Sequence, residues 1–477
     1  MPGVPTIETT LAAFAKRELT PAEHTAQTLT AIEQLEPQLN AFLEVFNAEG
    51  RAAAAQPKKG RLSGIPVAIK DIICTTEGHT SAASKILQNF RSPFDATVVQ
   101  KLRAEGAIII GKTNCDEFAM GASNEFSAFG PVKNPWDTSR VAGGSSGGSI
   151  AAVASGEVLA ALGSDTGGSL RLPASFCNVV AVKPTYGRVS RHGVIAYASS
   201  FDQVGPAART VRDAALLLEI IAGHDPYDAT SSPEPPGAYL AACGQSVAGL
   251  RIGLPKEFFS QEVDGRIQET VLTAVKELEK QGAQLIEISL PLAPMAVPTY
   301  YLLVKSEAST NLSRYDALRY GELPKITAGN LLEHYRAARS HFGPEVKRSI
   351  LMGTYALSAG YIEAWYKQAS KVRTLMRQEF TNAFAEVDVI AGPVSAEVAF
   401  PLGEKTDDPL AMYLADLLTD PASVAGLPAL SVPAGFVDDL PVGLQLIAPH
   451  FTEERLFQTA HAYEQSQEWW QMMPLLH

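Results

Sequence analysis

The chain has 477 residues, of which 46% are hydrophobic and 19% charged, and its formal net charge is −12. This composition is typical of a folded globular protein, and the length allows two or three domains or one large α/β unit. No run of Lys or Arg interrupts the acidic balance, which excludes the basic stripe that direct nucleic-acid binding requires.

The positions of the cysteines and the lengths of the apolar runs indicate the kind of protein and its compartment. The four cysteines lie far apart, at positions 74, 115, 177 and 243, without a CxxC or Cys/His cluster. We therefore expect neither a disulfide framework nor a metal site. The N-terminus lacks a signal-peptide pattern, and the apolar runs are shorter than the about 20 residues that span a bilayer. A soluble, unprocessed, cytoplasmic protein without membrane contact is expected.

The first half of the chain alternates helical and strand patterns. Residues 20–23 (TPAE) are typical of a helix start, because Thr caps, Pro occupies the first turn and Glu stands third. Residues 64–73 and 106–113 are apolar and β-branched, as in buried strands, and a helical pattern at 95–106 separates them. The alternation predicts βαβ units and a largely parallel sheet.

The rest of the chain continues this rhythm. Residues 142–169 are rich in Gly and Ser but contain small apolar residues that can form a tight helix and a strand. The stretch SSPEPPG at 231–237 predicts a surface loop inside one domain. Further strand patterns lie at 250–255, 284–291, 386–393, 427–433 and 442–449, with a helical pattern from Ile267 to Leu278 between the first two.

Two familiar catalytic motifs match by chance. Residues 106–113 (GAIIIGKT) fit the expression of a phosphate-binding loop, but Ala-Ile-Ile-Ile is the interior of a strand. Residues 144–148 (GSSGG) fit a nucleophile elbow centred on Ser146, which must follow a strand and be served by a histidine. The preceding residues have a loop composition, and no histidine stands in a triad context. We reject both interpretations.

A lysine and two serine clusters predict a different chemistry. Lys70 ends an apolar strand, where lysine is rare unless it is paired or functional. Removal from water lowers the pKa of an amine, so that it becomes available as a neutral base. Serine is a poor nucleophile until its proton is removed. Ser145 and Ser169 can relay that proton to Lys70, although either cluster alone is more simply interpreted as a packing loop.

The second cluster has an additional use. Residues 165–169 read DTGGS, and glycines leave successive backbone N–H groups free to converge on an oxyanion. One cluster then carries the proton, and the other carries the attacking oxygen together with an anion hole.

With these residues in view, the chain resembles the amidase signature family. The motifs are KDII at 70–73, AGGSSGGS at 142–149 and GSDTGGSLRLPAS at 163–175, and Ser169 follows Ser145 by 24 residues, as in that family. The resemblance implies that Lys70 is the base and Ser169 the acyl-forming nucleophile. It also implies that Ser145 bridges them on a cis peptide, with an oxyanion hole from Thr166, Gly167, Gly168 and Ser169.

The family resemblance also implies a fold. This is one α/β domain across residues 1–477, with its signature core at about 62–206 and a mixed central β-sheet sandwiched between layers of α-helices. Stretches at 116–137, 183–194, 197–206, 352–361 and 371–380 further resemble the branch that forms the glutaminase subunit of tRNA-dependent amidotransferases.

Membership of that branch implies a division of labour. Glutamine acylates Ser169, and ammonia passes to a tRNA-binding B subunit that activates glutamate with ATP and Mg²⁺, in a complex with a small C subunit. This chain then needs no cofactor and binds no nucleic acid itself. A stand-alone amidase acting on another small amide and a catalytically silent scaffold remain alternatives, as does the choice between Gln-tRNA and Asn-tRNA as product.

Substrate recognition is where the chain departs from that branch. The resemblance places Tyr300, Asp416 and an arginine at position 349 around the amino-acid end of glutamine, but residue 349 is serine. Serine cannot make a bidentate charged contact with a carboxylate. Either Arg348 reaches in from the neighbouring position, or the substrate is not glutamine. Leu172 in place of glutamine and Ile72 in place of asparagine are further departures.

Overall fold

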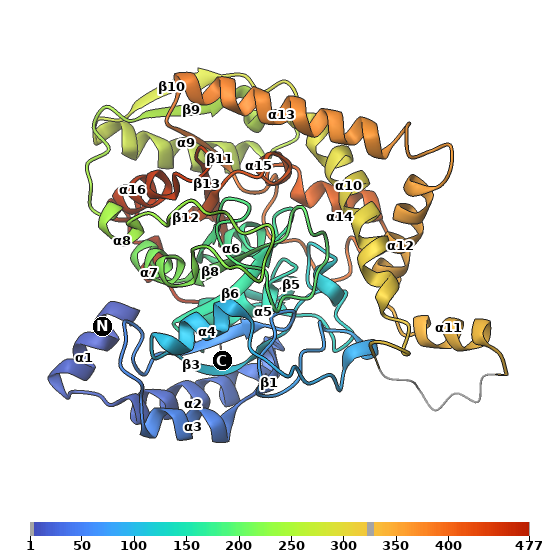
Figure 1. The fold of residues 1–477 in the computed structure, drawn as a ribbon. Coiled ribbons are helices and arrows are strands. Elements are labelled where there is room, and N and C mark those ends of the chain that lie inside the picture. The colour runs from blue at the N-terminus through green and yellow to red at the C-terminus, as the bar shows by residue number, and fades with distance from the viewer. Residues whose placement is uncertain (1–3, 322–328, 477) are drawn as a thin grey trace.

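The computed structural model describes residues 4–321 and 329–476, and one central sheet runs through them (Figure 1). Its eleven strands lie in the order β1-β3-β2-β6-β8-β7-β12-β13-β11-β9-β10. Their bounds are Phe42–Val45 (β1), Pro66–Lys70 (β2), Ile108–Thr113 (β3), Ala160–Asp165 (β6), Val180–Lys183 (β7), Gln203–Ala208 (β8), Arg251–Pro255 (β9), Gln284–Ile288 (β10), Val389–Pro393 (β11), Ala429–Val437 (β12) and Leu440–Ile447 (β13). Residues 1–3 and 477, the two ends of the predicted 1–477 domain, lie outside the described residues, as do residues 322–328.

The sheet is mixed, as the family resemblance implies, but it is not largely parallel. Strand β2 runs parallel to β3 and β6, and β9 runs parallel to β10 and β11, so the predicted βαβ units are confirmed. The central strands β8, β7, β12 and β13 pair antiparallel. Strands β12 and β13 are joined by Asp438 and Asp439, both at positive φ, and such a two-residue turn forces antiparallel pairing. The alternation of strand and helix patterns along the sequence does not show the direction in which neighbouring strands pair.

Helices cover both faces of the sheet. The helices α2 (Pro21–Leu39), α5 (Gly147–Ala154) and α6 (Arg171–Cys177) pack on one face. The helices α4 (Thr97–Ala104), α7 (Val211–Ile221), α9 (Gly265–Lys280) and α16 (Glu453–Glu464) pack on the other. Alternate residues of β2 supply the two cores, with Val67 and Ile69 in one and Ala68 in the other, because strand side chains alternate between faces.

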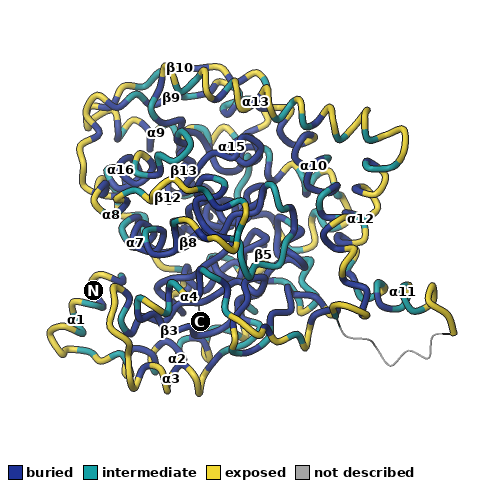
Figure 2. Tube along the Cα trace, viewed as in Figure 1, coloured by how far each residue is buried: buried dark blue, intermediate teal, exposed yellow. Residues whose placement is uncertain are grey.

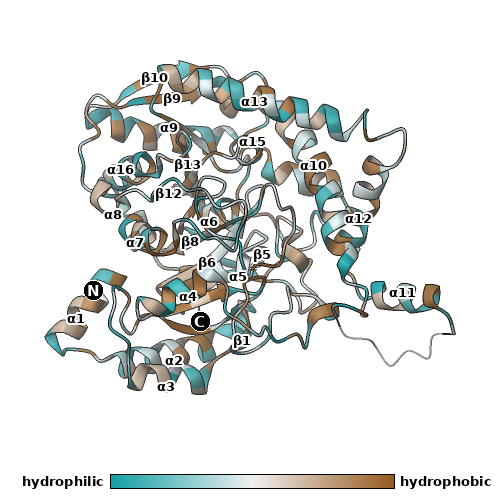
Figure 3. Ribbon diagram, in the orientation of Figure 1, coloured by the Kyte–Doolittle hydropathy of each residue, from teal (hydrophilic) through white to brown (hydrophobic). Residues whose placement is uncertain are grey.

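A helical layer stands beside the sheet, on the right of Figure 1. There α10 (Ala296–Asn311) packs against α12 (Pro344–Leu357), α13 (Tyr366–Glu386) and the short α15 (Asp420–Ala425). The remaining α-helices are α1 (Ile7–Lys16), α3 (Asn47–Ala55), α8 (Tyr239–Ala242), α11 (Leu331–Arg339) and α14 (Pro409–Tyr413). Figure 2 shows the buried residues gathered along the sheet, and Figure 3 shows apolar strands there with polar positions on the outer helices.

Most local predictions are confirmed. Helix α2 begins at Pro21, where the Thr20 hydroxyl accepts from Glu23 N and the Glu23 carboxylate accepts from Thr20 N. Residues 108–113 lie in the buried strand β3, as expected of a strand and not of a phosphate-binding loop. Residues 233–236 are exposed, as a surface loop requires.

One local interpretation is wrong. The residues before Ser146 have a loop composition, but Lys133–Asn134 (β4) and Asp137–Val141 (β5) form a small two-stranded sheet. The polar sequence DTSRV hides this strand because the small sheet stands apart from the central one and leaves β5 partly in solvent. The elbow interpretation still fails, because Ser146 donates its hydroxyl proton to the Ser164 carbonyl instead of meeting a histidine.

Neither membrane nor metal features stand out in the described part of the chain. Among residues 4–321 and 329–476, no helix combines the length and the apolar character that a membrane crossing needs. The same residues contain no cluster of three His, Cys, Asp or Glu that could hold a metal ion. All four cysteines are buried and free.

Candidate active site

The topology brings the predicted catalytic segments to one edge of the sheet. Strands β2 and β6 are parallel neighbours that end at Lys70 and Asp165, so the loops that follow them start side by side. Helix α5, which begins just after Ser145 and Ser146, packs on both strands. In open α/β sheets this carboxyl edge, next to a change in strand direction, is where ligands bind.

Lys70 is the centre of a cluster of hydroxyl groups. Its side chain is 0% exposed. Its Nζ donates to Ser145 Oγ at 2.7 Å, Ser146 Oγ at 2.9 Å and Ser164 Oγ at 2.9 Å. The structure therefore joins the base and the bridging serine that the sequence predicts, and it adds two hydroxyls that hold the amine in place.

The surroundings of Lys70 favour its neutral form. Burial lowers its pKa from 10.5 to about 8, although the more distant negative charges of Asp116, Asp165 and Asp202 act in the opposite direction. Its hydrogen-bond partners are hydroxyls, which cannot neutralise a buried ammonium as a carboxylate would. An amine with this pKa can accept a proton from Ser145 near neutral pH.

Ser169 lies next to this pair through its backbone. The Gly144–Ser145 peptide is cis, as the family resemblance implies. Ser146 N donates to the Ser169 carbonyl at 3.1 Å, which ties the two serine clusters together. The Ser169 side chain is 7% exposed, and its Oγ forms no hydrogen bond within residues 4–321 and 329–476. The final link of the relay, from Ser169 to Ser145, stays a prediction.

The loop that precedes Ser169 is held in place by hydrogen bonds to the Gly167 carbonyl. Arg171 is fully buried and binds Asp165 with two nitrogens, at 2.9 and 3.0 Å. Arg171 Nη2 and Ser423 Oγ both donate to the Gly167 carbonyl at 2.8 Å. In the described part of the chain, no acceptor meets the N–H groups of the predicted residues 166–169. These amides are free to receive an oxyanion.

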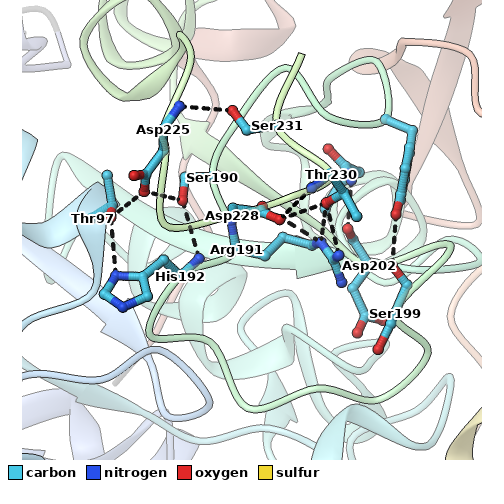
Figure 4. A network of polar contacts seen from close by, with 12 residues as sticks. Thr97, Ser190, Arg191, His192, Ser199, Asp202, Asp225, Asp228, Thr230 and Ser231 are labelled. Carbon is cyan, nitrogen blue, oxygen red and sulfur yellow. Dashed lines mark hydrogen bonds and ion pairs between the residues drawn. The ribbon is translucent and has the colours of Figure 1, made fainter. Parts of the chain in front are cut away.

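The start of that loop is anchored through Asp202, which lines a pocket together with members of a polar network around Arg191 and Asp228 (Figure 4). Thr166 Oγ1 donates to Asp202 Oδ1 at 2.9 Å. Arg191, whose charge partly offsets the effect of burial on the pKa of Asp202, donates from its backbone to Asp228 and from its guanidinium to Thr230, each at 2.8 Å. Thr166 is therefore fixed to Asp202, which also accepts from the backbone N–H groups of Tyr197 and Ala198.

Tyr300 and Asp416 both lie beside the glycine loop. A Cβ added to Gly167 would stand 2.8 Å from Tyr300 Oη, and one added to Gly168 would stand 2.8 Å from Asp416 Oδ1. The two glycines are therefore required for this close approach. The structure thus brings together the loop and these two predicted substrate-binding residues.

Arg348 and Ser349 lie farther from the loop, on α12. Arg348 pairs with Glu345 and is 31% exposed, and none of its described contacts reaches the glycine loop. Ser349 Oγ instead accepts from Lys305 Nζ at 2.8 Å, and Lys305 also pairs with Glu345 at 2.6 Å. A buried cation from α10 therefore stands against position 349, where the resemblance implies an arginine.

Four further residues belong to the description of the site: two that differ from the usual residues of the related branch, and two that the sequence analysis did not identify. Leu172 and Ile72 are buried among apolar side chains. Lys305 and Asp420 were not identified from sequence, although both are buried charged residues inside apolar helical stretches. A charged residue in an apolar stretch is the signal that marks Lys70, and the sequence contains the same signal at Lys305 and Asp420.

Known proteins match this chain over almost its whole length. The family model described as amidase matches residues 23–457. The A subunit of glutamyl-tRNA(Gln) amidotransferase from Chloroflexus aggregans is 51% identical over 473 residues, which cover 97% of this chain and 96% of that protein. Its counterpart from Pseudomonas aeruginosa is 52% identical over 468 residues, with 96% of each covered.

Solved structures agree with this match. The crystal structure of the A subunit of glutamyl-tRNA(Gln) amidotransferase from Thermotoga maritima has a TM-score of 0.83 at 42% identity, covering 99% of this chain and 97% of that one. Family model, relatives and fold all coincide on the segments that build the Lys70 cluster and the glycine loop. The chain belongs to the amidase signature family.

Proposed function

We propose that this chain is the glutaminase subunit of a tRNA-dependent amidotransferase, which hydrolyses glutamine and releases ammonia for the amidation of Glu-tRNA(Gln). The observation that carries the proposal is the buried Lys70–Ser145 contact of 2.7 Å beside a loop of free amides. The 51–52% identity to the A subunits of glutamyl-tRNA(Gln) amidotransferases supports the choice of substrate.

The residues perform the reaction in two half-reactions. Neutral Lys70 takes a proton from Ser145, which takes one from Ser169, and Ser169 Oγ attacks the carbon of the side-chain amide. The amides of residues 166–169 receive the oxyanion. The C–N bond breaks as the relay returns a proton to nitrogen, and ammonia leaves. Water then attacks the ester on Ser169 by the same relay, and glutamate leaves.

An exposed apolar surface supports the presence of partner subunits. Large apolar side chains are exposed on α12, on the segment after it, and on α14 and the residue after it; α14 contacts α12 through Tyr413 and Glu345. Isolated proteins rarely expose contiguous surfaces of this kind. We propose that a tRNA-binding B subunit, which holds ATP and Mg²⁺, and a small C subunit complete the complex in the cytoplasm. The side chains are Leu351, Met352, Tyr355, Tyr361, Trp365, Leu410 and Leu414.

Ser349 favours a second candidate function. A site without an arginine at this position can serve a stand-alone amidase whose substrate has no carboxylate. The two functions differ in the requirement for partners. Ammonia release should therefore be measured from glutamine and from a panel of simple amides, with and without the B and C subunits. Glutamine turnover only in the complex supports the glutaminase, whereas turnover of other amides by the isolated chain supports the amidase.

The Ser169→Ala variant tests whether the chain is catalytic at all. Loss of the nucleophile should reduce glutamine hydrolysis at least about 10⁴-fold. Ser139→Ala, on the exposed part of β5, is the matched control and should retain full activity. A Ser169→Ala complex that still forms its product from glutamine at the normal rate would show that this chain is a silent scaffold.

A further inference from the structure

Asp420 is a buried carboxylate without a partner. It is 0% exposed, and neither of its carboxylate oxygens has a hydrogen-bond partner among residues 4–321 and 329–476. Asp165 is equally buried but receives two nitrogens of Arg171. Buried carboxylates are almost always paired in this way, because an unpaired one is costly. The described residues therefore supply no partner for Asp420, and we expect the partner to come from a bound molecule.

The unpartnered oxygens point at the glycine loop. Asp420 Oδ1 lies 2.8 Å from the point that a Cβ of Gly167 would occupy, next to Tyr300 Oη. Asp416 Oδ1, which also has no partner among the described residues, takes the same position against Gly168. Two unsatisfied carboxylate oxygens thus line the loop that is predicted to receive the oxyanion.

The nearby cations are committed elsewhere. Arg171 binds Asp165, the Gly167 carbonyl and further acceptors, and no described contact joins it to Asp420. Lys305 binds Glu345 and Ser349. The other Asp416 oxygen accepts from Tyr301 Oη at 3.3 Å, which brings no positive charge. A small ligand cation with several N–H donors would satisfy both carboxylates.

We propose that Asp420 joins Asp416, which the family resemblance already places at the amino-acid end of glutamine, in receiving the ammonium group of the substrate, so that Asp420 is a further specificity-determining residue of the reaction. The inference rests on the proposed glutaminase function, in which this group is the α-ammonium of glutamine. An ammonium has three N–H donors and can serve both carboxylates at once. Asp420 thereby selects amides that carry an amine over amides that do not.

The test compares glutamine with glutaramate, which is glutamine without its α-amino group. In the complex with its partner subunits, Asp420→Asn keeps the shape of the side chain and removes its charge. We expect kcat/KM for glutamine to fall about 10- to 100-fold, the usual effect of a lost hydrogen bond to a charged group, while kcat/KM for glutaramate stays the same or rises. Equal losses for both substrates, or none for either, would overturn the proposal.

Thermal unfolding supplies a second readout. Because Asp420 is unsatisfied in the free chain, Asp420→Asn should unfold at the same or a higher temperature in the absence of substrate. A clear fall in the unfolding temperature would show a structural role and overturn the inference. Asp213→Asn is the matched control, because Asp213 is a buried carboxylate on α7 that accepts from Ile7 N, remote from this site.

A last comparison separates this inference from the proposed function. If the wild-type complex hydrolyses no glutamine, the proposed function fails, and 4-aminobutanamide and butanamide replace the first substrate pair. A wild-type preference for the aminated amide that Asp420→Asn removes would sustain the ammonium site. Indifference of the wild type to the amine would refute it.

Discussion

Two buried lysines of this chain differ in what surrounds them. Lys70 ends strand β2 and contacts three serine hydroxyls. Lys305 lies in α10 and contacts the Glu345 carboxylate at 2.6 Å as well as Ser349. Both side chains are almost completely shielded from solvent. Burial alone therefore does not decide what a lysine does.

The difference lies in charge compensation. Burial lowers the pKa of both amines, but only for Lys305 does a contacting carboxylate oppose it. Burial also raises the pKa of Glu345, yet Lys305 and Arg348 outweigh it, and that pKa ends below its ordinary value. Lys305 and Glu345 therefore hold each other charged, whereas the hydroxyls around Lys70 leave it free to lose its proton.

The largest expected effect comes from removing the base. Lys70→Ala should abolish acylation of Ser169, because the relay loses its terminal proton acceptor. Lys70→Arg should be almost as inactive, with a loss of about 10³- to 10⁴-fold, because a guanidinium remains protonated. Single-turnover measurement of acyl-enzyme formation checks both. Lys367→Arg, at an exposed lysine paired with Glu363, is the control and should form the acyl-enzyme at normal speed. An acyl-enzyme formed at normal speed by either Lys70 variant would contradict the mechanism.

The next effect concerns stability. Lys305→Met leaves Glu345 buried with only Arg348 as a charged partner, and it should lower the free energy of unfolding by about 3 kcal/mol. Lys367→Met, which breaks the exposed pair with Glu363, should cost less than about 1 kcal/mol. Denaturant unfolding of both variants measures the contrast. Equal losses would mean that the buried pair is no more important than a surface one.

The smallest effect is a pH profile. Because the pKa of Lys70 is about 8 and only its neutral form accepts a proton, the acylation rate should rise about tenfold per pH unit below that value and level off above it. Lys305→Arg should leave the midpoint unchanged, since Lys305 does not carry the proton. A rate that stays constant between pH 6 and 9 would show that Lys70 is not the titrating base.

Local sequence patterns predicted a large part of this molecule. The capping residues of α2 and the apolar strands β2 and β3 depend on neighbours in sequence, and they were found. Lys70 stood out for the same reason, since a charge at the end of an apolar strand is visible without a structure. The family motifs predicted the roles of the serines, and the structure places Ser145 in contact with Lys70.

Features set by distant partners escaped prediction. The antiparallel pairing of β12 with β7 and the ion pair of Lys305 with Glu345 are examples. Lys305 and Asp420 escaped for the same reason. Their meaning depends on which acceptor or donor lies against them, and that is decided by helices far apart in the chain.

By itself the sequence determined which segments become most of the strands and helices, and it predicted a lysine and two serines for the proposed reaction, because propensity, capping and motif spacing act over a few residues. Only the tertiary structure decided which buried charges are compensated and which are left open. Lys305 finds Glu345 across two helices, while Asp420 finds no cation among the residues that the structure describes. Coulomb interactions follow distance in space, and folding alone sets those distances.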